Sequence, residues 1–260
     1  MKKTVSFLML LTGIHFAQAQ DFSAYKKEFF IQAADTLRYR ILYPENYKKE
    51  KSYPLVVFLH GAGERGNDNE AQLSHGGDLF LKDSLRKQFP AIVVFPQCPS
   101  DSLWTKAPPK LDTTKAYNLA LDTAALTVPE RLVKLLMDSL IQNKIADKKR
   151  IYIGGLSLGG FGTYSLVIHF PNYFAAAFPI CGEANVPLYV KQAAKVPIWI
   201  FHGALDNVIS PQPDRDLIKA LHDAGKKNAK YTEYPDAQHN SWDSAFAEPL
   251  LLPWLFSFRK

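Results

Sequence analysis

The chain has 260 residues, of which 47% are hydrophobic and 22% charged, and it carries a formal net charge of +6. That length is ordinary for one α/β domain with a sizeable core. The positive charges form no basic block, which argues against a nucleic-acid-binding protein, and no repeat or heptad pattern occurs. The mild positive charge would suit acidic polysaccharides or anionic surfaces as partners. An ordinary solvated surface explains the charge more simply.

The first 19 residues have the pattern of a signal peptide. Lys2 and Lys3 precede an apolar run over residues 5–16, and Ala17-Gln-Ala19 supplies a small-x-small cleavage site. The run is too short for a membrane span, which needs about 20 residues. No cysteine follows the cleavage site, which argues against a lipoprotein. We therefore expect cleavage after Ala19, a secreted or periplasmic protein without a membrane anchor, and a single catalytic domain over residues 20–260.

Strand and helix patterns alternate along the rest of the chain, which predicts a mostly parallel sheet with helices on both faces. The first two strands are expected to form an antiparallel hairpin. The expected strands cover residues 27–34, 36–43, 54–59, 91–95, 150–154, 175–180, 196–201 and 229–234.

Helices are predicted between these strands. Thr127-Val-Pro-Glu130 has the pattern of a capping box, and leucines follow it at helical spacing. Further helices are expected over 161–170, which Pro171 ends, and over 213–224. Residues 66–70 and 99–110 are expected to be loops at the carboxyl ends of strands, where α/β proteins place their ligand sites.

A glycine-rich loop, His60-Gly-Ala-Gly-Glu-Arg-Gly66, follows the strand at 54–59. Its glycines let the backbone turn and expose N–H groups that can hold an oxyanion, and we assign the Ala62 N–H to this task. A dinucleotide-binding loop is the competing interpretation of Gly-x-Gly-x-x-Gly. It lacks support because no ribose-binding acid stands about twenty residues on, and no Gly-Lys-Ser/Thr follows.

The pentapeptide Gly155-Leu-Ser-Leu-Gly159 follows the strand at 150–154 and precedes an apolar helix. This pattern is typical of a serine nucleophile in a strained turn between a strand and a helix, where only glycine relieves the crowding on either side. Ser157 is therefore the candidate nucleophile. The residue after such a serine usually donates its N–H to the oxyanion, which makes Leu158 the second candidate donor.

A serine nucleophile needs a base and an orienting carboxylate. Asp206 lies just past the strand at 196–201, and His239 lies past the last strand. The order Ser157, Asp206, His239 is that of the α/β-hydrolases. Asp214 and Asp236 are the alternative acids.

The other candidate groups have simpler explanations. His60 and His202 each precede a glycine at a strand end and are expected to brace loops, and His75, His169 and His222 lie in helical or loop patterns. Trp104 and Trp242 are candidate platforms for an acyl group or a sugar, with core packing as the alternative. No His-Glu-x-x-His or paired Cys-x-x-Cys occurs, so the sequence does not support zinc catalysis and we expect no metal site.

Cys98 and Cys181 are the only cysteines. Export would permit a disulfide, but their strands are expected to be separated by two others. That spacing is about 14 Å, beyond the roughly 7 Å limit for bridging. We expect no disulfide.

Four motifs carry a resemblance to a known group of enzymes: the segments 59–66, 95–99, 155–162 and 239–242. They resemble those of secreted α/β-hydrolases of the phospholipase/carboxylesterase-like, feruloyl-esterase-like and single-domain prolyl-oligopeptidase-like groups. The resemblance spans nearly the whole chain after residue 19 and implies an α/β-hydrolase fold, a catalytic Ser157, Asp206 and His239, and no cofactor. The segment 100–126 is longer than in a minimal member and leaves the substrate open.

Three functions follow from this interpretation. The first is a secreted serine hydrolase that cleaves carboxylic esters, with acetyl or feruloyl esters of polysaccharides as candidate substrates. The second is a prolyl-oligopeptidase-like serine peptidase. The third is a non-catalytic binding module on the same fold. In each case the expected partner is a small-molecule or polysaccharide-linked substrate and not a nucleic acid.

Overall fold

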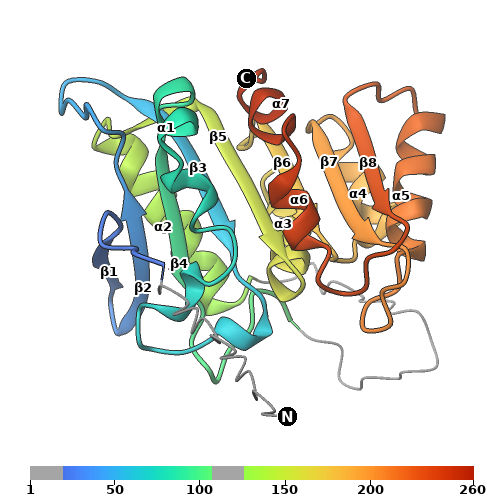
Figure 1. Cartoon of the computed structure of the whole chain (residues 1–260), viewed down its shortest axis with the longest axis horizontal. Helices are drawn as coiled ribbons and strands as arrows, with labels where there is room; N and C mark the ends of the chain where they lie inside the picture. Colours follow the sequence, from blue (N-terminus) through green and yellow to red (C-terminus); the bar gives the residue numbers. More distant parts are fainter. Residues whose placement is uncertain (1–19, 107–125) are drawn as a thin grey trace, which may run out of the picture.

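The computed structural model describes residues 20–106 and 126–260, in which eight strands form one sheet (Figure 1). Their order across the sheet is β1-β2-β4-β3-β5-β6-β7-β8. The strands are β1 (Lys26–Gln32), β2 (Asp35–Leu42), β3 (Tyr53–Leu59), β4 (Ile92–Gln97), β5 (Ala146–Leu156), β6 (Ala176–Ile180), β7 (Ile198–Gly203) and β8 (Ala229–Tyr234).

The pairing confirms the expected architecture. β1 and β2 form an antiparallel hairpin, β2 is antiparallel to β4, and every other neighbouring pair is parallel. β5 starts at Ala146, four residues before the predicted start, because the polar residues 147–150 continue the strand where the sequence shows no apolar pattern. In a parallel sheet the carboxyl ends of the strands share one edge, so the loops after β3, β5, β7 and β8 lie at the same edge.

Helices cover both faces of the sheet (Figure 1). One layer holds α2 (Val128–Gln142), α3 (Leu158–His169), α4 (Val186–Ala193) and α5 (Gln212–Asp223). The other holds α1 (Asp83–Gln88), α6 (Trp242–Ala247) and α7 (Leu251–Phe256), together with the 3-10 turns Ala71–Leu73 and Leu79–Leu81. A further 3-10 turn, Ala62–Glu64, follows β3. α2, α3 and α5 were expected, whereas the short helices α1, α4, α6 and α7 were not.

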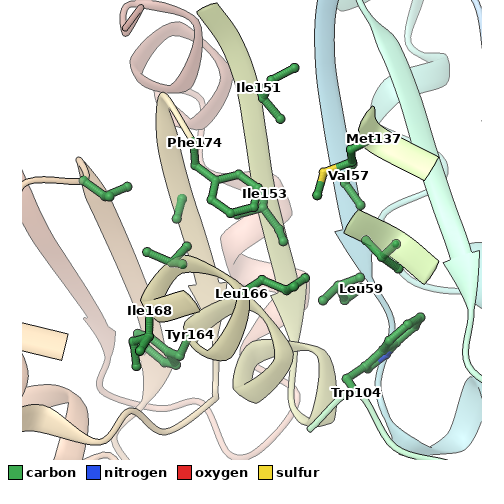
Figure 2. Close-up of a cluster of buried hydrophobic side chains, with 14 of the residues drawn as sticks. Val57, Leu59, Trp104, Met137, Ile151, Ile153, Tyr164, Leu166, Ile168 and Phe174 are labelled. Carbon is green, nitrogen blue, oxygen red and sulfur yellow. The ribbon is translucent and has the colours of Figure 1, made fainter. Parts of the chain in front are cut away.

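The core consists of two apolar layers, one on each face of the sheet. Along β3, Leu55, Val57 and Leu59 belong to one layer, while Val56 and Phe58 belong to the other. Alternate side chains of a strand point to opposite faces, and because both faces are covered, the strand is an unbroken apolar run. Figure 2 shows the first layer, where Val57 and Ile153 lie among side chains that include Met137 of α2 and Leu166 of α3.

The capping box at the start of α2 forms as predicted. The Thr127 N–H donates to Glu130 Oε2 at 2.9 Å, and the Glu130 N–H donates to Thr127 Oγ1 at 3.3 Å. These bonds satisfy N–H groups at a helix start that have no partner inside the helix.

Two sequence-based expectations fall on residues that the structure does not describe. The predicted signal peptide over residues 1–19 lies wholly outside the described residues, and so does most of the 100–126 segment. Within the described ranges, none of the helices has the length and hydropathy required to cross a membrane. Cys98 and Cys181 are both buried and free, and their strands β4 and β6 are separated by β3 and β5.

Candidate active site

Ser157 occupies the turn between β5 and α3. Its backbone has φ 51° and ψ −117°, a conformation that side-chain-bearing residues rarely adopt. The Ser157 N–H donates to the carbonyl oxygen of Ile180 in β6 at 2.9 Å, which anchors the turn to the neighbouring strand. The side chain is only partly buried and is therefore open to a substrate.

The two glycines of the motif are required by close packing. A Cβ atom at Gly159 would lie 2.0 Å from the carbonyl oxygen of Leu59, at the end of β3. A Cβ atom at Gly155 would lie 2.3 Å from the carbonyl oxygen of Gly159. Both distances are far below van der Waals contact with atoms that cannot easily move. The motif thus brings the serine turn directly against the loop after β3.

Three side chains from three loops form a hydrogen-bonded line at this edge of the sheet. His239 follows β8, and its Nε2 lies 2.9 Å from Ser157 Oγ. Its Nδ1 lies 2.8 Å from Asp206 Oδ2, in the loop after β7. The Asp206 carboxylate can only accept a hydrogen bond, so in a neutral His239 the proton is on Nδ1 and is donated to Asp206. Nε2 then accepts a hydrogen bond from the Ser157 hydroxyl.

Asp206 is held as a carboxylate. Its Oδ1 accepts the N–H groups of Val208 and Ile209, each at 2.9 Å. Burial opposes the charge, but the hydrogen bonds from His202, His239 and these two N–H groups outweigh burial and hold the pKa of Asp206 well below its usual range. Of the alternative acids, Asp236 is exposed and Asp214 contacts His202 instead of His239.

A buried network lies behind Asp206 and includes His202, for which the sequence predicted only a role in bracing a loop. The His202 side chain has no exposed surface. Its Nε2 lies 3.3 Å from Asp206 Oδ2 and 3.1 Å from the Ile209 carbonyl oxygen. Its Nδ1 lies 2.7 Å from Asp214 Oδ2. Asp214 Oδ1 accepts the Tyr164 hydroxyl at 2.6 Å. Burial alone would lower the pKa of His202, but Asp206 and Asp214 outweigh it and raise that pKa to about 9. The raised pKa favours the imidazolium form of His202 at neutral pH, hydrogen-bonded to Asp206 and to Asp214, whose own pKa is raised by burial.

Glu183 lies near this network, just after β6. Its side chain is buried, and its Oε2 has no hydrogen-bond partner in the structure. Burial raises the pKa of Glu183 to about 8, with a further contribution from Asp214. The raised pKa favours the protonated form of Glu183 at neutral pH, which spares the interior another negative charge.

The two candidate oxyanion donors flank the serine. Leu158 is the first residue of α3, and Ala62 is the first residue of the 3-10 turn after β3. The first N–H of a helix has no partner within the helix and is free to bind an anion. Gly61, next to Ala62, approaches Ser157 so closely that a Cβ atom placed on it would lie 3.7 Å from Ser157 Cβ.

The two candidate tryptophans have different surroundings. Trp242 is partly exposed and packs edge-to-face against His239, with ring centroids 5.5 Å apart. Trp104 is 0% exposed, and its Nε1–H donates to the His60 carbonyl at 3.0 Å (Figure 2 shows it in the core). Trp104 therefore does not form the substrate platform considered from the sequence, because no part of its ring is accessible.

His60 braces the loop after β3. Its Nδ1–H donates to the Gly61 carbonyl at 2.6 Å, and its Nε2 accepts the Cys98 N–H at 2.9 Å. Burial lowers the pKa of His60 to about 4, which keeps the ring neutral. This agrees with the bracing role predicted from the sequence.

A set of possible metal-binding atoms overlaps the site. Ligand atoms of Cys181, Asp206 and His239 lie within 4.8 Å of one another. Two of the three residues are already hydrogen-bonded in the Ser157–His239–Asp206 line, and burial raises the pKa of the Cys181 thiol, which disfavours the thiolate that a metal requires. We assign no metal to these atoms.

The sheet, the serine turn and the hydrogen-bonded Ser-His-Asp line define an α/β-hydrolase. The family model described as Phospholipase/Carboxylesterase matches residues 46–248, and the chain belongs to this family. A solved thermostable esterase superposes with a TM-score of 0.80 and 32% identity, covering 92% of this chain and 64% of that chain. Together these findings show an α/β-hydrolase of the Phospholipase/Carboxylesterase family, and the chain spans slightly less than two thirds of the length of the thermostable esterase.

Other relatives are more distant or partial. A bifunctional acetylxylan esterase/xylanase of Neocallimastix patriciarum is 30% identical over 118 residues, which are 42% of this chain and 17% of that protein. An acyl-protein thioesterase 1 homolog of Dictyostelium discoideum is 25% identical over 191 residues, 72% of this chain and 85% of that protein. A ferulic acid esterase of Anaeromyces mucronatus, solved with ferulic acid, has a TM-score of 0.63 and 14% identity over 88% of this chain and 89% of that chain, a likeness of fold alone.

Proposed function

We propose that the protein is a serine carboxylic-ester hydrolase in which Ser157, His239 and Asp206 are the catalytic residues. The observation that carries this proposal is the unbroken hydrogen-bonded line from Ser157 Oγ through both ring nitrogens of His239 to Asp206, with distances of 2.9 and 2.8 Å. These distances suit transfer of the serine proton to the imidazole.

The proposed reaction has two steps. His239 Nε2 takes the Ser157 proton as Oγ attacks the ester carbonyl, and the N–H groups of Ala62 and Leu158 stabilise the oxyanion. His239 then gives its proton to the leaving alcohol, which departs and leaves an acyl-serine. Water attacks this acyl-enzyme with His239 again as base, and the acid and free Ser157 are released. Asp206 stabilises the imidazolium in both steps.

For the substrate, we propose acetyl or feruloyl esters attached to polysaccharides. A relative with such an activity in its name, an acetylxylan esterase/xylanase that is 30% identical over 118 residues, supports this class. Trp242 supports it as well, because its partly exposed ring beside His239 offers an aromatic face next to the reacting serine. The proposal includes cleavage of the signal peptide after Ala19 and export of one catalytic domain over residues 20–260.

The test is a comparison of substrates on purified residues 20–260, with Ser157→Ala as the background. We expect Ser157-dependent hydrolysis of an aryl acetate, and faster turnover of methyl ferulate or acetylated xylan than of an X-Pro anilide. Anilide cleavage at an efficiency comparable to that of the esters would instead support the peptidase. Absence of any Ser157-dependent turnover would support the non-catalytic binding module.

A further inference from the structure

A second concave surface lies at the opposite end of the sheet from Ser157. It has a volume of about 580 Å³ and is lined by Ala24, Lys26, Tyr43, Tyr47, Lys49, Asn143 and Ile145; we call it the tyrosine groove. Ile145 directly precedes β5, whereas Ser157 directly follows it. β3 pairs with β5 from Tyr53 opposite Ala146 to Leu59 opposite Gly155, with an irregularity in the register between them. These six steps along β3, at about 3.3 Å per residue, put the groove and the serine roughly 20–25 Å apart.

The wall of the groove is built from tyrosines on the loop between β2 and β3, drawn light blue in Figure 1. The Tyr43 and Tyr47 ring centroids are 4.7 Å apart, and Tyr47 and Tyr53 are 5.5 Å apart. Both groove tyrosines are only half-buried, which leaves ring surface accessible. The rings are tilted against one another, at 57° and 38°, and hold each other in place. Their accessible parts offer flat aromatic surface on which the C–H faces of sugar rings can pack.

The loop that carries these tyrosines is held in place. The Tyr47 N–H donates to the Pro44 carbonyl at 3.1 Å, and the Lys48 N–H donates to the Tyr53 hydroxyl at 3.0 Å. Arg86 donates to the Tyr43 carbonyl at 3.1 Å. A ligand therefore meets a largely preformed surface and does not have to order it, which lowers the cost of binding.

Cations predominate around the rings, although the charge of Glu28 also acts on Tyr43. Lys26 Nζ lies 5.4 Å from the Tyr43 ring centroid, and Lys49 lines the same groove. A neighbouring depression of about 410 Å³ on the same loop includes four further cations, Lys48, Lys51, Arg86 and Lys87, and one acid, Glu45. Glu45 is paired with Arg86 at 3.8 Å. Among the described residues that line the two depressions, cations thus far outnumber acids, and an anionic ligand is favoured.

We infer that the tyrosine groove is a secondary binding site for a polysaccharide that carries carboxylate groups, such as one containing uronic acids. Aromatic faces would pack against the sugar rings, and Lys26 and Lys49 would pair with the carboxylates. This inference rests on the proposed function for its choice of polymer, because an enzyme bound to a polysaccharide through this groove keeps its catalytic serine near esters on the same polymer. A nucleic acid is the other anionic polymer that basic and aromatic groups bind, and the test includes it.

The test measures binding separately from catalysis. Native electrophoresis of the Ser157→Ala chain, through gels containing polygalacturonate, glucuronoxylan or neutral arabinoxylan, gives a dissociation constant for each polymer. The groove variants are Tyr47→Ala and the double substitution Lys26→Gln/Lys49→Gln. Lys195→Gln/Lys219→Gln is the matched control, because both residues are exposed, lie outside the groove and change the charge equally.

We expect the uronate-bearing polymers to retard the protein more than arabinoxylan does, and both groove variants to bind about tenfold more weakly than the control. About 0.5 M salt should weaken this binding, since the charges are exposed. In the Ser157-containing background, hydrolysis of a small aryl ester should be unchanged by the groove variants. That activity reports on the proposed function independently of polymer binding.

Three results would overturn the inference. The first is the absence of retardation by either acidic polymer. The second is equal weakening in the groove variants and the lysine control, which would indicate only a general effect of charge. The third is tighter groove-dependent binding of a single-stranded oligonucleotide than of the acidic polysaccharides, which would assign the groove to a nucleic acid.

Discussion

Asp206 Oδ2 has two histidine neighbours: His239 Nδ1 at 2.8 Å and His202 Nε2 at 3.3 Å. His239 faces the serine, whereas His202 has no exposed side-chain surface and connects Asp206 to the buried Asp214. Asp206 is therefore positioned from both sides, and the loop after β7 is tied to the interior by a charged network.

Replacement of His202 should destabilise the protein because it leaves Asp214 buried without its cationic partner. We expect His202→Gln to lower the free energy of unfolding by about 3–5 kcal/mol. The double variant His202→Gln/Asp214→Asn should recover part of this loss, because it pairs two neutral amides. Chemical denaturation measures the free energy of unfolding of both variants, with His222→Gln as the control. If His202→Gln were as stable as His222→Gln, the network would contribute little to stability.

The same network predicts a pH dependence of stability. The pKa of His202 is about 9 in the folded protein and about 6.5 in an unfolded chain, so its contribution is complete below about pH 6.5 and is lost as the pH rises through about 9. Between these values the free energy of unfolding should fall by about 1–3 kcal/mol more in the wild type than in His202→Gln/Asp214→Asn. Parallel curves for the two proteins in denaturation at a series of pH values would argue against a charged His202.

Glu183→Gln should stabilise the protein at alkaline pH. A carboxyl group with a folded pKa of about 8 binds a proton in the folded state that the unfolded chain has already released above about pH 4.5. As the pH rises from about 4.5 to about 8, the wild type should therefore lose about 1–3 kcal/mol more stability than the glutamine variant, which keeps His202 but lacks the titrating carboxyl group. The measurement is the difference in Tm at pH 5 and pH 9. A variant less stable than the wild type at pH 9 would mean that the charged carboxylate has a partner the structure does not show.

Gly159→Ala should disrupt the serine turn. The new Cβ would lie 2.0 Å from the Leu59 carbonyl oxygen, so either the turn or β3 must shift. We expect a loss of at least about 3 kcal/mol in stability and of most ester hydrolysis. Gly63→Ala is the control for stability, because nothing lies within 4 Å of a Cβ atom at that position. Equal Tm values for the two variants would refute the packing argument.

The two tryptophans should separate stability from substrate binding. Trp104→Phe removes the hydrogen-bond donor to the His60 carbonyl and leaves a gap in the core. We expect the free energy of unfolding to fall by about 1–3 kcal/mol, with a lower Tm, while KM changes little. Trp242→Ala should raise KM for aromatic esters more than for an acetate. Thermal denaturation and steady-state kinetics of both variants test this pair, and a selective KM effect in Trp104→Phe would reverse the two assignments.

Much of the site could be predicted from the sequence because its signals are local. The two glycines lie two residues before and two residues after Ser157, directly behind a strand, and Asp206 and His239 each follow a recognisable strand. The pairing of His202 with Asp214 depends on how α5 packs against β7, and no periodic pattern in the sequence predicts that pairing. The burial of Trp104 likewise depends on tertiary packing, here against Gly162 of α3. The short helices α1, α4, α6 and α7 have too few turns to give a clear period.

The central claim is that Ser157 carries out ester hydrolysis, and the most direct measurement is kcat for an aryl acetate in the wild type and in Ser157→Ala, with circular dichroism to verify the fold. The account predicts a loss of about 10³ to 10⁶ in kcat with the fold intact. A folded Ser157→Ala variant that retained most of the activity would contradict it.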